Sequence, residues 1–190
     1  MSKNTKENFI EAFLVLAREQ KNLDFSISML CKKAGYTRAT FYSYFQTFED
    51  VLHAINDEVH AECYPEITKF QLKNLNSDNL LDVLLPALYK HRETLRIIYM
   101  SGCEYQWTTF TIEKYWSWAK DGIISLTQNT VVKHPELFFS LLLKQIQSII
   151  YNWLIYDFAE KPKEVKERFQ FFLTHSFTQL TDFSEGTVMK

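Results

Sequence analysis

The side chains best suited to recognise another molecule lie close together between Ser26 and Tyr44. The last eight residues of this stretch hold Arg38, three aliphatic hydroxyl groups and two tyrosines. Arginine can donate two parallel hydrogen bonds to a planar pair of acceptors, and hydroxyl groups bind the oxygen atoms of anions such as phosphate. These residue types favour a binding site over a catalytic site.

Two short helices joined by a tight turn are predicted to position these side chains. Ser26 is a predicted N-cap of the first helix, and Gly35 tolerates the positive φ that a sharp turn requires. Thr37 is the predicted N-cap of the second helix, in which Phe41 and Phe45 lie four residues apart on one face. That face packs inward, and the opposite face is free to make contacts.

A helix, a glycine-containing turn and a short second helix are the parts of a helix-turn-helix, whose second helix enters the major groove of DNA. Arg38 is then the candidate for a bidentate contact to guanine, and Ala39 and Thr40 for base edges or a thymine methyl. The other candidate DNA-binding residues, most of them for phosphates, are Ser26, Thr37, Tyr42, Ser43 and Tyr44. Two alternatives stay open: a solvated side chain for Arg38, and packing roles for the two tyrosines.

The cap, the turn glycine and the aromatic pairs up to residue 55 resemble the N-terminal signature of the TetR family of bacterial transcriptional regulators. The resemblance implies a homodimer that binds a palindromic double-stranded operator, most often as a repressor released by a small-molecule effector. Phe48 stands where such sequences usually have a phosphate-binding lysine, and Ala39 stands where glycine is frequent. Loss of one cationic contact predicts weaker DNA binding and a log–log salt slope smaller by roughly 0.9.

Composition predicts an all-α protein of about nine helices, because 46% of the residues are hydrophobic and only 4 Gly and 4 Pro are present. We expect a helix-turn-helix domain in residues 1–55 and a helical ligand-binding and dimerisation domain in residues 56–190. Residues 1–48 hold seven basic and four acidic side chains, whereas the remainder holds 14 and 19. This asymmetry favours an N-terminal nucleic-acid surface, although a solvated helix face with a slight lysine excess would look similar.

The other predicted helices follow from apolar spacing, caps and prolines. They run over Thr5–Gln20, from Phe48 toward Pro65, from Ser77 or Asp78 with a bend at Pro86, over Tyr89–Met100, over Tyr105–Gln128, from Pro135 to about Asp157, and from Pro162 to about Phe183. Thr47 and Asp50 form a near capping box at the start of the helix from Phe48.

The last two predicted helices are apolar over more than one face, so each must be buried on more than one side. They are either central core helices or, as the resemblance implies, half of a two-fold four-helix interface. The candidate dimer-interface residues are Ile146, Ile150, Trp153, Phe169, Phe172, Leu173 and Leu180.

Aromatic residues make up 16% of the chain and could line a cavity for an apolar or aromatic effector. The candidate ligand-binding residues are Tyr99, Trp107, Phe110, Trp116 and Tyr151. Aromatic rings at helical spacing are also typical of an ordinary core. A further alternative is that the body binds a protein partner, or that the bound form activates transcription; an exposed apolar patch would favour a partner and a cavity would favour an effector.

Enzymatic, cofactor and metal sites are not predicted. The five histidines form no HExxH motif, GxSxG is absent, and the scattered glycines cannot build a phosphate-binding loop. Three widely spaced cysteines argue against a disulfide framework or a zinc site. The polar N-terminus and the short, interrupted apolar run at residues 148–158 predict no export signal and no membrane span, hence a cytoplasmic protein.

Overall fold

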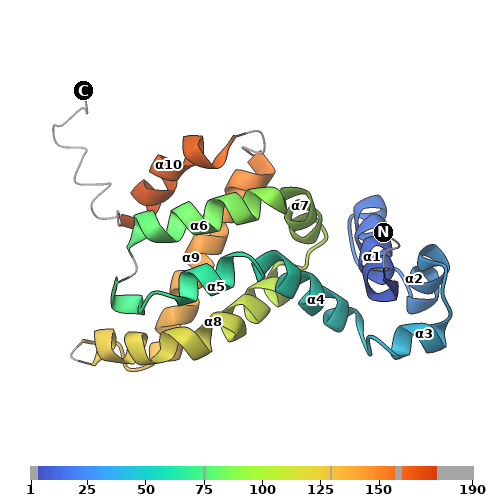
Figure 1. Cartoon of the computed structure of the whole chain (residues 1–190), viewed down its shortest axis with the longest axis horizontal. Coiled ribbons are helices and arrows are strands. Elements are labelled where there is room, and N and C mark those ends of the chain that lie inside the picture. The colour runs from blue at the N-terminus through green and yellow to red at the C-terminus, as the bar shows by residue number, and fades with distance from the viewer. Residues whose placement is uncertain (1–3, 75, 129, 157–159, 175–190) are drawn as a thin grey trace.

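The computed structural model describes residues 4–74, 76–128, 130–156 and 160–174, and these residues form ten α-helices, one short 3-10 helix and no β-strand (Figure 1). The elements are α1 (Thr5–Gln20), α2 (Ile27–Ala34), α3 (Arg38–Tyr42), α4 (Phe48–His60), α5 (Cys63–Thr68), the 3-10 helix (Leu72–Asn74), α6 (Ser77–Lys90), α7 (Arg92–Met100), α8 (Glu104–Thr127), α9 (Pro135–Tyr156) and α10 (Pro162–Thr174). The prediction of an all-α fold is confirmed, with ten α-helices among these residues where about nine were expected.

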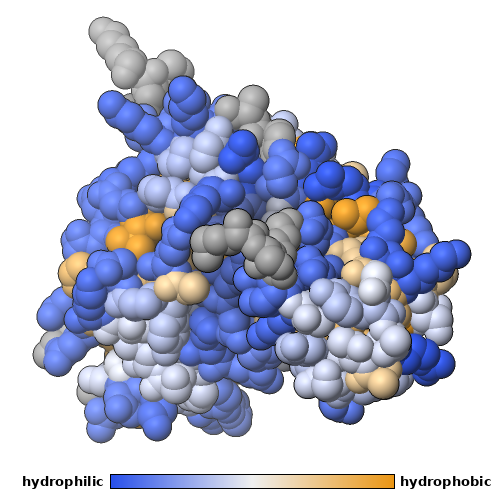
Figure 2. All heavy atoms as spheres, turned by 45° about the vertical axis from the view of Figure 1, so that its right-hand side comes forward, coloured by the Kyte–Doolittle hydropathy of each residue, from blue (hydrophilic) through white to orange (hydrophobic). Residues whose placement is uncertain are grey.

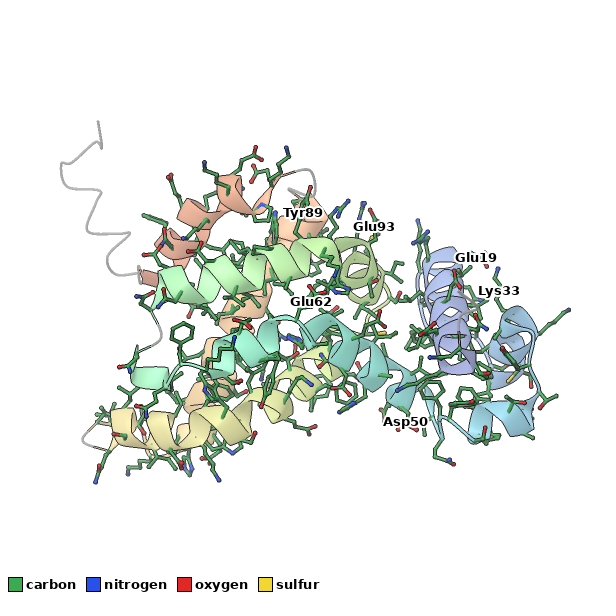
Figure 3. The ribbon with its side chains drawn as sticks, viewed as in Figure 1. Glu19, Lys33, Asp50, Glu62, Tyr89 and Glu93 are labelled. Atoms are coloured by element: carbon green, nitrogen blue, oxygen red, sulfur yellow. The ribbon has the colours of Figure 1, made fainter. Side chains whose placement is uncertain are left out.

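The first three helices form a small head around aromatic rings (Figure 1). Phe9 and Phe13 of α1 are fully buried, and their rings meet Phe41 and Phe25 at centroid distances of 5.4 Å each. An ion pair of 3.0 Å between Glu19 and Lys33 joins α1 to α2 on the surface (Figure 3). The sequence folds this way because each helix of the head contributes apolar side chains to a shared core.

The remaining helices form a body that α4 connects to the head (Figure 1). Helices α8 and α9 pack along each other, and α6 packs against α5 and α10. Lys166 of α10 forms ion pairs with Asp78 and Asp82 of α6 at 3.0 and 2.6 Å. The head also contacts the body directly through α1, which packs on α7. At this contact the Ser101 hydroxyl lies 3.4 Å from the carbonyl oxygen of Ala17.

Several helix boundaries differ from the predictions. The second helix of the motif, predicted to include Phe45, ends at Tyr42, and the predicted end of the last helix near Phe183 lies outside the described residues. The helix that starts at Phe48 ends at His60, and Pro65 lies inside the separate helix α5 near its start, where a missing N–H costs little. A break at His91 divides α6 from α7, and Pro86 lies inside α6. Local apolar spacing does not distinguish one long helix from two short ones that turn against different neighbours.

All three cysteines are free and buried: Cys31 in the head, Cys63 at the start of α5 and Cys103 before α8. Burial raises the pKa of each thiol, to about 11 for Cys103. Figure 2 shows that hydrophilic residues cover most of one face of the molecule, with hydrophobic residues in small separate groups. No helix among the described residues is long and apolar enough to cross a membrane.

Candidate nucleic-acid interface and internal cavity

The turn that precedes α3 is fixed by local hydrogen bonds. The Ser26 hydroxyl accepts from the backbone N–H of Met29 at the start of α2, and Gly35 ends α2 with a φ of 79°. The Thr37 hydroxyl then accepts from the backbone N–H of Thr40 at 3.1 Å. The two predicted N-caps and the predicted turn glycine are confirmed, so this motif is specified by its own residues.

The inner face of α3 is held by the rings beneath it. Phe41 and Phe45 are 0% and 3% exposed, and their ring centroids lie 5.7 Å apart. Both rings also meet Phe9 of α1. A five-residue helix is too short to be stable alone, so this aromatic packing gives α3 its fixed orientation.

The outer face of the motif carries the predicted DNA-binding side chains. All of them are exposed except Thr40, which is half-buried, and Tyr42 and Tyr44 are 39% and 50% exposed. The exposed or half-buried residues are Ser26, Thr37, Arg38, Ala39, Thr40, Tyr42, Ser43 and Tyr44. Each of these side chains is therefore at least partly accessible from outside the head.

Arg38 is not simply solvated, because Tyr42 supports it one helical turn away. The guanidinium Nη2 lies 3.4 Å from the Tyr42 hydroxyl, and its carbon lies 5.9 Å from the centroid of the Tyr42 ring. The side chain is held along the exposed face of α3 with donors left to point outward.

Phe48 has a structural role that explains the absence of a lysine at this position. Its ring is half-buried and meets Phe13 and Phe25 at centroid distances of 5.9 and 5.1 Å. A lysine here would leave that aromatic cluster incomplete. The contact with the head core is tertiary, so the sequence revealed the unusual residue but not its reason.

Two exposed residues near α3 escaped the sequence analysis. Lys6 places its ammonium 6.0 Å from the centroid of the Phe45 ring, and the Gln46 side chain donates to the carbonyl oxygen of Tyr42 at 3.0 Å. The positive charge of residues 1–48 pointed to a basic surface there without selecting Lys6. Its proximity to α3 becomes visible only when α1 is folded against it.

The start of α4 is fixed to the end of α3 by a carboxylate. Asp50 accepts from the backbone N–H groups of Gln46 and Thr47 at 2.7 and 2.9 Å, and these bonds lower its pKa. The Thr47 hydroxyl in turn accepts from the backbone N–H of Asp50, which completes the predicted capping box.

The opposite half of α4 meets α8 through polar groups. Asn56 is buried and donates to the Thr111 hydroxyl at 3.1 Å, while Lys114 forms an ion pair with Asp57 at 2.6 Å. His60 is also buried, and its Nδ1 lies 3.2 Å from the Tyr115 hydroxyl. Specific hydrogen bonds therefore fix the register of α4 on the body.

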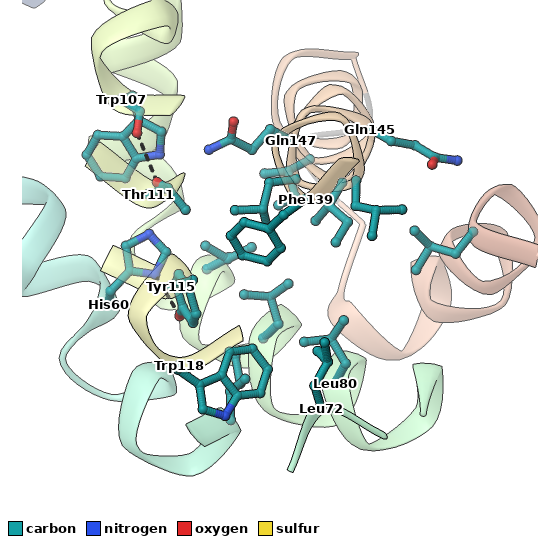
Figure 4. A pocket seen from close by; sticks show the side chains of 18 of the residues that line it. His60, Leu72, Leu80, Trp107, Thr111, Tyr115, Trp118, Phe139, Gln145 and Gln147 are labelled. Atoms are coloured by element: carbon teal, nitrogen blue, oxygen red, sulfur yellow. Dashed lines mark hydrogen bonds between the residues drawn. The ribbon is translucent and has the colours of Figure 1, made fainter. Parts of the chain in front are cut away.

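An apolar cavity of about 240 Å³ lies in the body where α4 ends (Figure 4). Aromatic rings and aliphatic side chains from α4 to α10 line it, and none of its described lining residues is Lys, Arg, Asp or Glu. The side chains at its wall that carry a polar group are His60, Tyr99, Trp107, Thr111, Tyr115, Trp118, Gln145 and Gln147. Burial lowers the pKa of His60 to about 4, so this ring is neutral near pH 7.

The predicted ligand-binding residues divide into two groups. Tyr99 and Trp107 are buried and line the cavity. Phe110, Trp116 and Tyr151 are half-buried and lie outside the cavity wall, where their rings meet His53, Phe139 and Tyr99 respectively. For these three the structure assigns packing contacts, because their positions on α8 and α9 face other neighbours.

The candidate dimer-interface residues also divide. Ile150, Trp153 and Phe169 are at most 5% exposed within a single chain, so their side chains belong to its core and present almost no surface to a partner. Ile146 and Leu173 are half-buried and line the cavity, and Phe172 is 49% exposed. Leu180 lies outside the described residues.

Comparison with known proteins places the fold. The sequence matches no protein-family model and no curated protein. Among solved structures, the fatty acid degradation regulator FadR from Bacillus halodurans resembles the chain with a TM-score of 0.57 and 16% sequence identity, over 90% of this chain and 98% of that one. The chain shares its fold with this regulator. The shared fold spans both the head and the body, because the match covers almost the full length of each chain.

Within the described ranges no group of three or more His, Cys, Asp or Glu side chains is arranged to hold a metal ion. His60 and Cys63 form a pair of potential ligands, with Sγ of Cys63 3.5 Å from Nδ1 of His60. Both also contact the Tyr115 hydroxyl, so these atoms form a buried hydrogen-bonded cluster.

Proposed function

We propose that this protein is a TetR-like, DNA-binding transcriptional regulator that acts as a homodimer on a palindromic operator. The observation that carries the proposal is α3, which is packed on the buried rings of Phe41 and Phe45 while it presents Arg38 outward. A helix held in this way in a helix-turn-helix can enter a major groove. The fold shared with a protein described as a fatty acid degradation regulator supports a regulatory role.

The exposed surface of α9 and α10 supports the dimer. Leu137 and Leu141 of α9 are 54% and 56% exposed, Leu142 is 37% exposed, and Phe172 of α10 is 49% exposed. A two-fold pairing of these helices with their copies would cover the exposed apolar side chains. Two heads held about 34 Å apart would then read successive major grooves.

The cavity supports regulation by a small molecule, with repression released when the effector binds. An effector that binds more tightly to a form with misplaced heads lowers the population of the DNA-binding form. A cavity within the body favours binding of a small effector over binding of a protein partner. A protein partner would have to bind the exposed leucines instead.

Selection of bound duplexes from a random DNA library tests the proposal. We expect a palindrome with half-sites about one helical turn apart. Arg38→Ala should weaken binding by about 1–3 kcal/mol per head and relax one position in each half-site. Lys6→Ala should weaken all sequences alike and reduce the log–log salt slope by roughly 0.9 per head.

Lys120→Ala is the matched control, since it removes one positive charge from an exposed position on α8 in the body. It should leave both affinity and salt slope unchanged. Enrichment of no sequence, or equal effects of the head and body variants, would count against the proposal.

A further inference from the structure

Two buried polar atoms at the cavity wall have no hydrogen-bond partner among the described residues: Nε2 of His60 and Oε1 of Gln147. The two side chains are only 4% and 8% exposed. Figure 4 shows both side chains at the cavity wall, His60 from α4 and Gln147 from α9. Buried polar groups are almost always paired, because an unpaired one costs about 1–3 kcal/mol. Their position at a cavity indicates that the missing partner is a bound molecule.

The hydrogen bonds of His60 determine which kind of group it offers. Its Nδ1 lies 3.2 Å from the Tyr115 hydroxyl, and an imidazole nitrogen is a better acceptor for that O–H than the Cys63 sulfur at 3.5 Å. When Nδ1 accepts, the proton of the neutral ring lies on Nε2. His60 therefore offers a donor to the cavity, while Gln147 offers an acceptor.

The rest of the wall limits the charge of the molecule. The remaining lining is overwhelmingly aliphatic and aromatic, and it provides no cationic side chain within the described residues. An ionised carboxylate or phosphate would be buried there without a counter-charge, which costs far more than burying a neutral polar group.

We propose that the cavity binds an uncharged, mainly apolar molecule whose hydroxyl or amide groups accept from His60 and donate to Gln147. A hydroxyl or an amide contains both a donor and an acceptor, so such a group can satisfy either atom. The inference names the effector class of the proposed regulator and in that respect rests on the proposed function. It excludes free fatty acids in their ionised form.

Isothermal titration calorimetry with the full chain at neutral pH tests this class. The probes are matched straight-chain alcohols, primary amides and carboxylates, from hexyl to dodecyl. We expect an alcohol or an amide to bind at least about tenfold more tightly than the carboxylate of equal length. Lowering the pH toward the pKa of the acid should strengthen only the carboxylate series, because the protonated acid is neutral.

Gln147→Met removes the acceptor with little change in volume and breaks no hydrogen bond within the described residues. We expect alcohols and amides to bind about tenfold more weakly to this variant. Gln128→Met makes the same change at an exposed position just after α8, outside the cavity wall. It should retain the original affinity. Substitution of His60 is avoided because Tyr115 depends on it for a hydrogen bond.

Equal or tighter binding of carboxylates at neutral pH would overturn the inference, as would no binding in any series or no effect of Gln147→Met. These measurements contain no DNA, so they stand apart from the duplex selection. Selective alcohol or amide binding without any effect on DNA binding would support the cavity chemistry and contradict the regulatory function. Sequence-specific DNA binding without binding of any probe would support the DNA-binding function and contradict the cavity chemistry.

Discussion

His60 carries a titratable ring into the interior at the last residue of α4. Burial lowers its pKa to about 4, with a further decrease from Lys114 and an opposing effect from Asp57. In an unfolded chain the same ring has a pKa near 6.5. The folded protein thus binds fewer protons than the unfolded chain between these two values.

The free energy of unfolding should therefore fall as the pH drops from about 6.5 to about 4, by up to about 3 kcal/mol from this residue. Urea denaturation at several pH values would measure the decrease. His60→Gln should flatten the slope in this window, although it lowers stability overall. His134→Gln, a change at an exposed histidine, should keep the original slope. Identical slopes for the protein and His60→Gln would contradict the assignment.

At the scale of the helix, the turn between α2 and α3 depends on one backbone conformation. Gly35 has a φ of 79°, and the N–H of Tyr36 donates to the carbonyl oxygen of Cys31 at 3.0 Å. A Cβ at this glycine would meet nothing within 4 Å, so a substitution there is opposed by backbone strain rather than by a clash.

Gly35→Ala should lower the free energy of unfolding by about 1–2 kcal/mol. Gly102→Ala is a matched control, because Gly102 has a φ of 73° and equally open surroundings but lies between α7 and α8. We expect both variants to lose similar stability in chemical denaturation, and only Gly35→Ala to weaken binding to a selected duplex at a temperature where both are folded. Equal DNA affinities would show that α3 does not need this turn.

The elements that the sequence predicted well are those with local causes. The caps at Ser26, Thr37 and Thr47 depend on hydrogen bonds spanning three residues, so their residue types were sufficient. The bounds of α1 were also predicted correctly, since its cap and apolar stripe lie within one helix.

The features that the sequence did not predict depend on contacts between distant helices. Trp107 and Trp116 both lie on α8, yet only Trp107 lines the cavity, whereas the Trp116 ring packs against Phe139 of α9 at a centroid distance of 5.6 Å. The polar cavity groups His60 and Gln147 gave no signal in the sequence, since an isolated histidine or glutamine is ordinarily exposed. Only the folded body brings these two side chains to the wall of one cavity.

At the scale of the whole molecule, α9 and α10 carry both buried and exposed apolar side chains. Trp153 and Phe169 are buried against their own chain with ring centroids 5.9 Å apart. Leu137 and Leu141 remain exposed and are available to a second copy. The core interpretation thus holds for the buried face of these helices, and the proposed interface is on their exposed face.

Leu141→Arg should weaken the proposed dimer at least about tenfold, because it places a charge in an apolar contact. Sedimentation equilibrium over a range of concentrations would measure the change. Val131→Arg introduces the same charge at a position that is 95% exposed between α8 and α9, and it should leave the association unchanged. A chain that is monomeric at all concentrations, or equally dimeric in both variants, would contradict the assigned interface.

The three buried thiols can report local opening of the native structure. A thiol reagent can reach Cys31, Cys63 or Cys103 only when the surrounding structure separates, so the labelling rate of each measures a local opening equilibrium. Cys31 lies in the head, Cys63 at the start of α5 and Cys103 just before α8. Labelling of the native protein would therefore measure local opening of the head, of the junction and of the body separately, without any introduced probe.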